Sequence, residues 1–286
     1  MIDVRGALAD ARARGIALLD AQLLLAHVLA TTRSELIAND DRALAAHEHA
    51  RWSSWLDRRA GGEPLAYLLG EKEFHGLVLE VGSAVLVPRP ETELVVEWAT
   101  ELIRARQIGG QTAPPNVVDL GTGSGAIALA IKRVHPAACV TATDASAAAL
   151  AVARRNAART GLAVELAAGW WWHAVDGRCF DVAVANPPYV AAGDPHLAAL
   201  RHEPTDALVS GRDGLDALRA IAAGAPSHLC AGGWLVVEHG FDQGAAVRAL
   251  LVAAGLDDVA TRRDLAGHER ATAGRRATAG RRAGAA

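Results

Sequence analysis

The sequence predicts an α/β protein in which a mostly parallel sheet follows a smaller helical region. Two observations support this fold class. The first 72 residues carry apolar positions at helical spacing, and from residue 88 onward short apolar runs alternate with amphipathic segments. Because parallel strands need crossovers between them, such alternation is typical of a parallel sheet covered by helices. With 286 residues the chain is long enough for two domains.

Residues 1–72 form the predicted helical domain, in which apolar side chains recur at helical spacing with polar faces opposite them. The predicted helices cover residues 4–14, 17–31 and 45–60. Gly61 and Gly62 end the last of them. In residues 73–87 apolar and polar residues alternate, which predicts a hairpin linker. The linker leads into the second domain, residues 88–275.

A strand, a glycine-rich turn and a helix follow one another in the second domain. Residues 116–120 predict a buried strand, and residues 126–131 predict a helix. The turn between them is Gly121-Thr122-Gly123-Ser124-Gly125. In this arrangement the backbone can closely approach a nucleotide-like ligand, because no Cβ blocks the ligand or the tight turn. The turn also fits a dinucleotide fingerprint, so it leaves NAD and S-adenosylmethionine as alternative cofactors.

An acidic residue ends the next predicted strand. Residues 139–143 predict that strand, and Asp144 follows it, about 20 residues beyond the glycines. A carboxylate in this place can accept hydrogen bonds from both ribose hydroxyls of a cofactor. Its alternative role is to cap the helix that begins near Ser146, since aspartate is a common N-cap residue. NAD and S-adenosylmethionine both carry a ribose, so Asp144 does not separate them.

The most informative motif is Asn186-Pro187-Pro188-Tyr189, which follows the predicted buried strand 180–185. The prolines stiffen the turn at the edge where open α/β sheets bind their ligands. The asparagine carbonyl and a neighbouring backbone carbonyl can accept both hydrogens of a planar NH2 group, while the tyrosine ring offers a stacking face. Such a site suits chemistry on an amide or amino nitrogen. It favours methyl transfer over hydride transfer, with an ordinary Asn-Pro turn as the alternative.

Several further segments match one known family in the right order. Upstream they are Glu63-Pro64-Leu65-Ala66-Tyr67-Leu68-Leu69-Gly70, Glu73-Phe74 and Leu86-Val87-Pro88-Arg89-Pro90-Glu91-Thr92-Glu93-Leu94. Downstream they are His202-Glu203-Pro204, Ala207-Leu208, Gly211-Arg212-Asp213-Gly214-Leu215-Asp216, Glu238-His239-Gly240, Asp264-Leu265-Ala266-Gly267 and Arg270. With the glycine turn and the Asn-Pro-Pro-Tyr motif, nearly the whole chain resembles the release factor glutamine methyltransferases (HemK/PrmC).

The resemblance implies a seven-stranded class I S-adenosylmethionine-dependent methyltransferase fold with a small N-terminal helical domain and a hairpin linker. It implies methyl transfer from S-adenosylmethionine to the side-chain amide of the glutamine in the Gly-Gly-Gln motif of peptide chain release factors. Residues 1–72 would recognise this protein substrate. An alternative substrate is a glutamine of a ribosomal protein. An amino group of DNA is a less favoured alternative, because the chain lacks a basic target-recognition region. An inactive cofactor-binding adaptor is a further alternative, against which the intact Asn186 argues.

The resemblance also assigns roles to individual residues. The implied cofactor-binding residues are Gly121, Thr122, Gly123, Ser124, Gly125, Asp144, Trp171 and Asn186. The implied substrate-binding residues are Asn186, Pro187, Pro188 and Tyr189. Asn186 and Pro187 would be catalytic, because their carbonyls hold both N–H bonds of the glutamine amide. Trp171 would lie near the adenine, with simple packing as its alternative. Trp170 departs from the family pattern, and three consecutive tryptophans cannot all face one pocket.

Composition favours a cytoplasmic enzyme without membrane or nucleic-acid partners. Apolar residues make up 51% of the chain, yet no uncharged apolar stretch reaches about 18 residues, and Asp3 and Arg5 leave no apolar signal core. The formal net charge of −3 offers no general grip on nucleic acid. We expect the three cysteines to be buried, reduced thiols, and the eleven dispersed histidines indicate no metal site. A monomer is expected.

Three remaining features receive no catalytic role. Gly109-Gly110-Gln111 copies the substrate tripeptide of the resembled family, but it lies in a linker rich in glycine and proline, where chance explains it. Glu238 and His239 end a predicted strand, where they either cap it or approach the pocket. Residues 276–286 are basic and rich in small residues, and we expect a disordered tail there.

Overall fold

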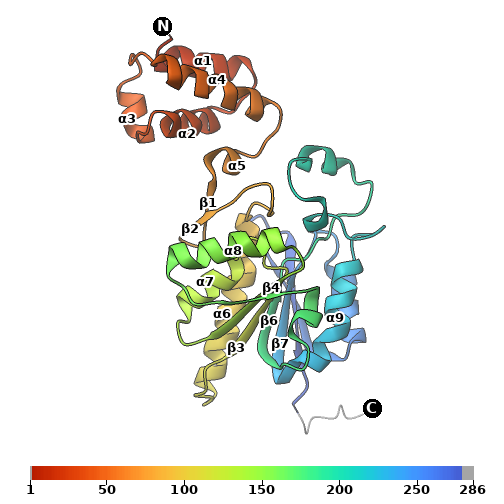
Figure 1. The fold of residues 1–286 in the computed structure, drawn as a ribbon. Helices are drawn as coiled ribbons and strands as arrows, with labels where there is room; N and C mark the ends of the chain where they lie inside the picture. The colour runs from red at the N-terminus through yellow and green to blue at the C-terminus, as the bar shows by residue number, and fades with distance from the viewer. Residues whose placement is uncertain (1, 279–286) are drawn as a thin grey trace. The chain divides into compact units, whose positions relative to one another are not determined.

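The computed structural model describes residues 2–278. The chain divides into two compact units, Met1–Lys72 and Glu73–Ala286 (Figure 1). Each cluster of buried apolar side chains lies within one unit or the other, so each unit has a hydrophobic core of its own. No helix among residues 2–278 is long and apolar enough to span a membrane.

The first unit is built from helices whose apolar sides meet in one core. They are α1 (Val4–Ala13), α2 (Leu18–Val28), α3 (Arg33–Ala38), α4 (Ala46–Ala60) and α5 (Leu65–Leu69). Leu24, Leu25, Trp52 and Leu56 are fully buried between them. The sequence pattern missed α3 and α5, because six and five residues are too few to show a period. The detectable signal for α3 is Thr32, the N-cap residue of a capping box.

A two-stranded hairpin follows, formed by β1 (Glu71–Phe74) and β2 (Leu77–Glu80). Leu77 and Leu79 are buried, whereas Val78 between them is 43% exposed, as the alternation predicts. The side chain of Asn156 holds β2 in place. Its Oδ1 accepts a hydrogen bond from the Glu80 amide at 2.7 Å, and its Nδ2 donates to the Glu80 carbonyl at 3.0 Å. These contacts fix residues 73–80 within the second unit.

The second unit, as far as the structure describes it, is a seven-stranded sheet with helices on both faces, which confirms the predicted fold class (Figure 1). The strands are β3 (Asn116–Leu120), β4 (Cys139–Asp144), β5 (Glu165–Ala168), β6 (Phe180–Ala185), β7 (Leu229–Glu238), β8 (Leu256–Arg263) and β9 (Glu269–Arg276). Their order is β5-β4-β3-β6-β7-β9-β8. The strands from β5 to β7 in this order are parallel, and β9 is antiparallel to both neighbours.

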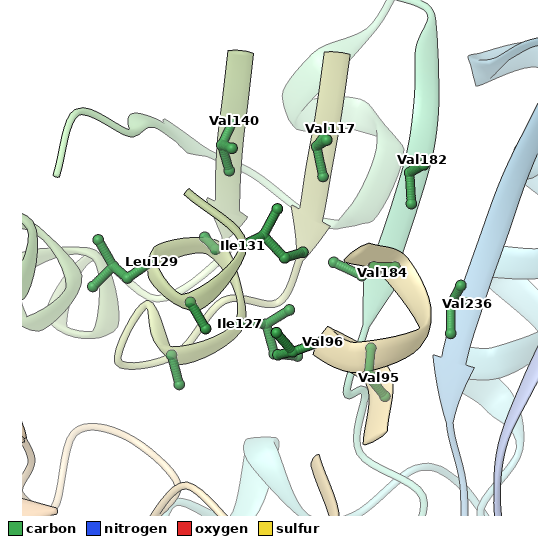
Figure 2. Packing of buried hydrophobic residues seen from close by; sticks show 14 of the residues in the cluster. Val95, Val96, Val117, Ile127, Leu129, Ile131, Val140, Val182, Val184 and Val236 are labelled. Atoms are coloured by element: carbon green, nitrogen blue, oxygen red, sulfur yellow. The ribbon is translucent and has the colours of Figure 1, made fainter. Parts of the chain in front are cut away.

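Alternate residues of the central strands face two separate cores. The covering helices are α6 (Glu93–Ile108), α7 (Ala126–Val134), α8 (Ala147–Thr160), α9 (Asp216–His228) and α10 (Gly244–Ala253). On one face Val117 and Val182 pack with side chains of α6 and α7, as Figure 2 shows. On the other face their sequence neighbours Val118 and Ala183 pack with α9 and α10. Burial on both faces explains why these strands are continuous apolar runs.

The strand order reverses at β3, which lies between β4 and β6. The last residue of β3 is in register with Thr143 of β4 and with Ala185 of β6. The residues that come next in these strands and their turns are Gly121, Asp144 and Asn186. Open α/β sheets bind ligands at the carboxyl ends of strands at such a reversal. Three motifs that are far apart in the sequence therefore meet at one edge of the sheet.

Two features differ from the predictions. The cysteines were expected to be buried, but Cys139 and Cys179 are exposed and Cys230 is partly buried, because all three lie where strands begin at the edge of the sheet. The tail was expected to begin at Arg276, but this residue ends β9, and its guanidinium donates to a carbonyl of β7. The part of the predicted tail beyond residue 278 lies outside the described residues.

Candidate active site

A cavity of about 380 Å³ lies at the carboxyl ends of β3, β4 and β6. Residues from the segments 84–92, 126–127, 145–149, 169–171 and 204–207 complete its lining. The lining includes eight residues that were predicted to bind cofactor or substrate: Gly121, Thr122, Gly123, Ser124, Asp144, Trp171, Asn186 and Pro188. Among residues 2–278, no group of three or more His, Cys, Asp or Glu side chains is placed to hold a metal ion.

Backbone hydrogen bonds fix the glycine turn to the end of β4. The amides of Gly121 and Thr122 both donate to the Thr143 carbonyl, at 2.9 and 2.8 Å. Gly121 and Gly123 have φ values of 77° and 55°, a region that residues with side chains rarely occupy. A Cβ on Gly123 would meet no atom within 4 Å, so the backbone borders open space there. The turn can therefore approach a ligand closely.

Asp144 supports the glycine turn while it lines the cavity. Its Oδ2 accepts a hydrogen bond from the Gly123 amide at 2.9 Å, and its Oδ1 accepts one from the Ser146 amide at 2.8 Å. Burial raises the pKa of Asp144, against the effect of these amides. Ser146 itself caps α8 by accepting from the Ala149 amide, so Asp144 is not the N-cap residue. Each carboxylate oxygen can accept a second hydrogen bond, which leaves capacity for ligand hydroxyls.

Asn186 lines the cavity and carries an unused acceptor. Its Nδ2 donates to the hydroxyl of Thr92 at 3.0 Å. Its Oδ1, by contrast, is buried and has no hydrogen-bond partner in the described part of the chain. An unsatisfied buried polar group costs roughly 1–3 kcal/mol. A ligand that donates an N–H bond to Oδ1 would remove this cost.

Three predicted site residues lie beside the cavity rather than in its lining. Gly125 begins α7, and a Cβ there would lie 3.2 Å from Leu129 and 3.4 Å from Ala153. Close packing of α7 on α8 therefore explains this glycine without a ligand contact. Pro187 is buried in the turn, and Tyr189 packs against the core on the α9 side of the sheet.

The three consecutive tryptophans separate into different surroundings. Trp171 has a left-handed backbone with φ 46°, and its ring lies 3.1 Å from where a Cβ on Gly121 would stand. Trp170 also borders the cavity but is 58% exposed. Trp172 turns away into the core, where its Nε1 donates to the Ile221 carbonyl at 2.8 Å. Only Trp171 combines cavity lining with contact to the glycine turn.

Replacing Gly224 with alanine is expected to destabilise the protein by about 1–3 kcal/mol, although alanine favours helices over glycine. A Cβ on Gly224 of α9 would lie 2.1 Å from Cδ1 of Trp172, so the indole must shift. Thermal unfolding measures the effect. Gly82→Ala is the control, because a Cβ there meets no atom within 4 Å. Equal unfolding midpoints for the two variants would contradict the packing of Trp172.

Two segments that are far apart in the sequence are joined beside the cavity. Glu203 is buried and accepts hydrogen bonds from the Val87 amide at 3.0 Å and from the guanidinium of Arg89. Val190, just after the Asn-Pro-Pro-Tyr turn, forms a parallel bridge with Val209. Both contacts hold the loop around Glu203 along the cavity, where Pro204 belongs to the lining.

Two buried carboxylates near the cavity were not predicted as site residues. Asp119 accepts hydrogen bonds from the Thr122 hydroxyl at 2.6 Å and from the Ala128 amide at 3.2 Å, and so ties the glycine turn to α7. Glu238 accepts one from the Tyr189 hydroxyl at 3.3 Å. Burial raises the pKa of each carboxyl group to about 7. The available signal was an acidic residue at or next to the end of a buried strand.

The fold and the site define a class I methyltransferase, with a seven-stranded sheet, a glycine turn at the strand reversal and an acid on the neighbouring strand. Two sequence profiles agree with this class. The profile described as PrmC N-terminal domain matches residues 3–70, and the profile described as Methyltransferase small domain matches residues 107–246. The chain is therefore an enzyme whose two units correspond to two known families of domains.

Named relatives are similar along almost the whole chain. The release factor glutamine methyltransferase of Xylella fastidiosa is 50% identical over 272 residues, which cover 94% of this chain and 97% of the relative. That of Burkholderia pseudomallei is 50% identical over 273 residues, with 92% and 94% covered. The chain belongs to the release factor glutamine methyltransferase family, which confirms the resemblance.

A solved structure supports the fold independently of close sequence similarity. The 16S rRNA methyltransferase RsmC of T. thermophilus, in complex with AdoMet and guanosine, has a TM-score of 0.51 and 20% sequence identity. The match covers 72% of this chain and 49% of that chain. This likeness is one of fold alone.

Proposed function

We propose that this enzyme transfers a methyl group from S-adenosylmethionine to the side-chain amide nitrogen of the glutamine in the Gly-Gly-Gln motif of peptide chain release factors. The observation that carries the proposal is Asn186, a cavity-lining amide whose Oδ1 is buried without a hydrogen-bond partner among residues 2–278. A carbonyl oxygen of this kind is the acceptor that a substrate NH2 group requires. The names of the relatives agree with this substrate.

The glycine turn and Asp144 fit S-adenosylmethionine. The open space over Gly123 has room for the methionine part, and the Asp144 carboxylate can accept both ribose hydroxyls. Trp171, which borders the turn, offers its ring to the adenine. When bound, S-adenosylmethionine supplies an electrophilic methyl group on its sulfonium. Gly121, Thr122, Ser124 and Gly125 would complete the cofactor site through the shape of the turn.

Asn186 and the carbonyl of Pro187 would hold the two N–H bonds of the substrate amide. The lone pair of an amide nitrogen is delocalised into its carbonyl, so two acceptors on its hydrogens favour the pyramidal nitrogen that must form. Positioning is the main contribution, because alignment of reacting groups can lower a barrier by about 7–11 kcal/mol. Pro188 and Tyr189 would contact the rest of the glutamine side chain. The proton leaves the nitrogen afterwards, to water.

Mass spectrometry of purified release factors tests the proposal. After incubation with the enzyme and S-adenosylmethionine, we expect one added methyl group on the glutamine of the Gly-Gly-Gln motif. Parallel incubations contain ribosomal proteins or DNA in place of the release factor. Methylation of either alternative without methylation of the release factor would contradict the proposed substrate.

Asp144→Ala is expected to weaken S-adenosylmethionine binding about 10- to 100-fold, because hydrogen bonds to a charged acceptor contribute roughly 1.5–3 kcal/mol. Calorimetry measures the affinity. Asp257→Ala removes an exposed carboxylate from β8 and serves as the control. Asp144→Asn keeps an acceptor for the Gly123 or Ser146 amide and should give an intermediate loss. Wild-type affinity in Asp144→Ala would mean that the acid only supports the backbone.

A further inference from the structure

Glu238 lies directly behind the amide-binding turn. Ala185 of β6 is in register with Val237 of β7, so Asn186 and Glu238 follow at neighbouring positions. Glu238 is completely buried. Its Oε1 accepts a hydrogen bond from the Tyr189 hydroxyl at 3.3 Å, whereas its Oε2 has no hydrogen-bond partner among the described residues. A buried carboxylate thus stands beside the proposed substrate site with acceptor capacity unused.

Thr92 connects this carboxylate to Asn186. The Thr92 side chain is buried, and its oxygen accepts the hydrogen bond from Asn186 Nδ2 at 3.0 Å. Its hydroxyl therefore still has one proton to donate. Thr92 is among the groups that lower the pKa of Glu238 against the effect of burial. An ionised Glu238 favours a Thr92 proton directed toward the carboxylate, which leaves the Thr92 oxygen to accept from Asn186.

We infer that ionised Glu238, acting through Thr92, orients the Asn186 amide and so sets the polarity of the substrate site. The oxygen and nitrogen of an asparagine amide fill nearly the same space, so hydrogen-bond partners decide which end points where. When Glu238 is ionised, Thr92 accepts the hydrogen bond from the NH2 end of Asn186, and Oδ1 remains for the substrate. A protonated Glu238 could donate to Thr92, and Thr92 to Asn186, which would turn the NH2 end toward the NH2 group of the substrate.

This inference rests on the proposed function and names Glu238 and Thr92 as positioning residues for it. It also predicts how activity depends on pH. Burial raises the pKa of Glu238 to about 7, with Glu91 adding to the rise and Thr92, Arg270 and Tyr189 opposing it. As the pH falls below this value, Glu238 becomes neutral and the rate should fall about tenfold per pH unit. Above it Glu238 is ionised, so the rate should be level.

The test measures release factor methylation from about pH 5.5 to 8.5 at saturating cofactor. Glu238→Gln is expected to lower kcat about 10- to 100-fold at high pH and to abolish the acid limb. Glu101→Gln, an exposed carboxylate on α6, should retain both the rate and the limb. The pKa of Asp119 is also raised to about 7 by burial. An acid limb that persists in Glu238→Gln would belong to another carboxyl group, such as Asp119 or Asp144, and would overturn the inference.

Thr92 supplies a second pair of variants. Thr92→Val removes the hydroxyl but keeps the shape, and should reduce kcat as Glu238→Gln does, whereas Thr92→Ser should restore it. Thermal unfolding at pH 8 checks the fold, and Glu238→Gln should unfold no earlier than wild type, since it removes a buried charge. Wild-type kcat in both Glu238→Gln and Thr92→Val would overturn the inference.

A readout besides activity separates this inference from the proposed function. The side-chain amide resonances of Asn186 in nitrogen-15-labelled enzyme are assigned by their absence in Asn186→Ala. They should shift with a midpoint near pH 7, the pKa of Glu238, and stay constant in Glu238→Gln. The same pH dependence of the Asn186 amide resonances in wild type and in Glu238→Gln would overturn the inference. A wild-type enzyme that leaves the release factor unmethylated would instead overturn the proposed function.

Discussion

Asn186→Ala is expected to lower methyl transfer about 100-fold or more, while S-adenosylmethionine binding stays close to that of wild type. The variant loses the proposed substrate acceptor Oδ1 and the hydrogen bond to Thr92. These hydrogen bonds contribute about 0.5–1.5 kcal/mol each. The larger part of the loss comes from alignment, because a small misplacement of the reacting atoms can reduce a rate about 100-fold. The glycine turn, Asp144 and Trp171 are unchanged, and Asn186 would only neighbour the cofactor.

Calorimetry with S-adenosylmethionine and mass spectrometry of the release factor are carried out on the same preparations of this variant. Asn116→Ala is the matched control, because it removes the same side chain from the exposed amino end of the adjacent strand β3. The control should keep both cofactor affinity and turnover. Normal turnover in Asn186→Ala would rule out Asn186 as the substrate acceptor. A large loss of cofactor affinity would instead assign the asparagine to the cofactor.

The meeting of the main motifs at one place could be predicted from the sequence. Gly121, Asp144 and Asn186 each follow a short buried strand, and each belongs to a local pattern that is visible without the fold. In a parallel sheet the carboxyl ends of all strands share an edge, so three strand ends predict one site. The strand order, with β3 between β4 and β6, then brings the three turns together.

The residues behind the site could not be predicted in the same way. Thr92 lies 94 positions from Asn186, and Tyr189 lies 49 positions from Glu238. A threonine in a turn and an acid at a strand end both have ordinary local uses, as caps or solvated groups. Only the packing of α6 and β7 against β6 brings Thr92 to Asn186 and Glu238 to Tyr189. Long-range contacts of this kind leave no periodic signal.

Keeping Glu238 ionised in the core lowers the stability of the protein. Its pKa is raised from an ordinary value of 4.5 to about 7, so the folded state holds the proton more tightly than the unfolded state does. Protonated Glu238 therefore adds to the free energy of unfolding. This contribution is fully present below the unfolded pKa of 4.5 and is lost as the pH rises through 7. The difference amounts to about 3 kcal/mol at pH 8. A buried carboxylate that is maintained at such a cost is typical of a functional site.

The first unit contains none of the predicted site residues. None of the residues that line the cavity comes from residues 2–72. The Gly-Gly-Gln motif offers little side-chain surface, which means that contacts elsewhere on the release factor must provide selectivity. We propose that the helical unit orients the protein substrate.

A chain that begins at Gly70 lacks this helical unit but keeps β1, which starts at Glu71. It is expected to bind S-adenosylmethionine like the full chain, because every cavity-lining residue and both cores of the sheet are retained. Activity on intact release factor should fall relative to activity on a short Gly-Gly-Gln peptide. The ratio should drop at least about 30-fold, since a single lost hot-spot contact contributes about 2 kcal/mol or more.

Four measurements make up the experiment, namely methylation of the protein and of the peptide by the full and by the shortened chain. Using a ratio matters, because a partly unfolded preparation lowers both activities equally and leaves the ratio unchanged. Circular dichroism and cofactor calorimetry establish that the shortened chain is folded. The peptide lacks the surfaces that the helical unit would contact. Removal of this unit should therefore reduce the activity on the peptide comparatively little. An unchanged ratio in a folded preparation would show that the first unit does not select the substrate, and would leave stability as its role.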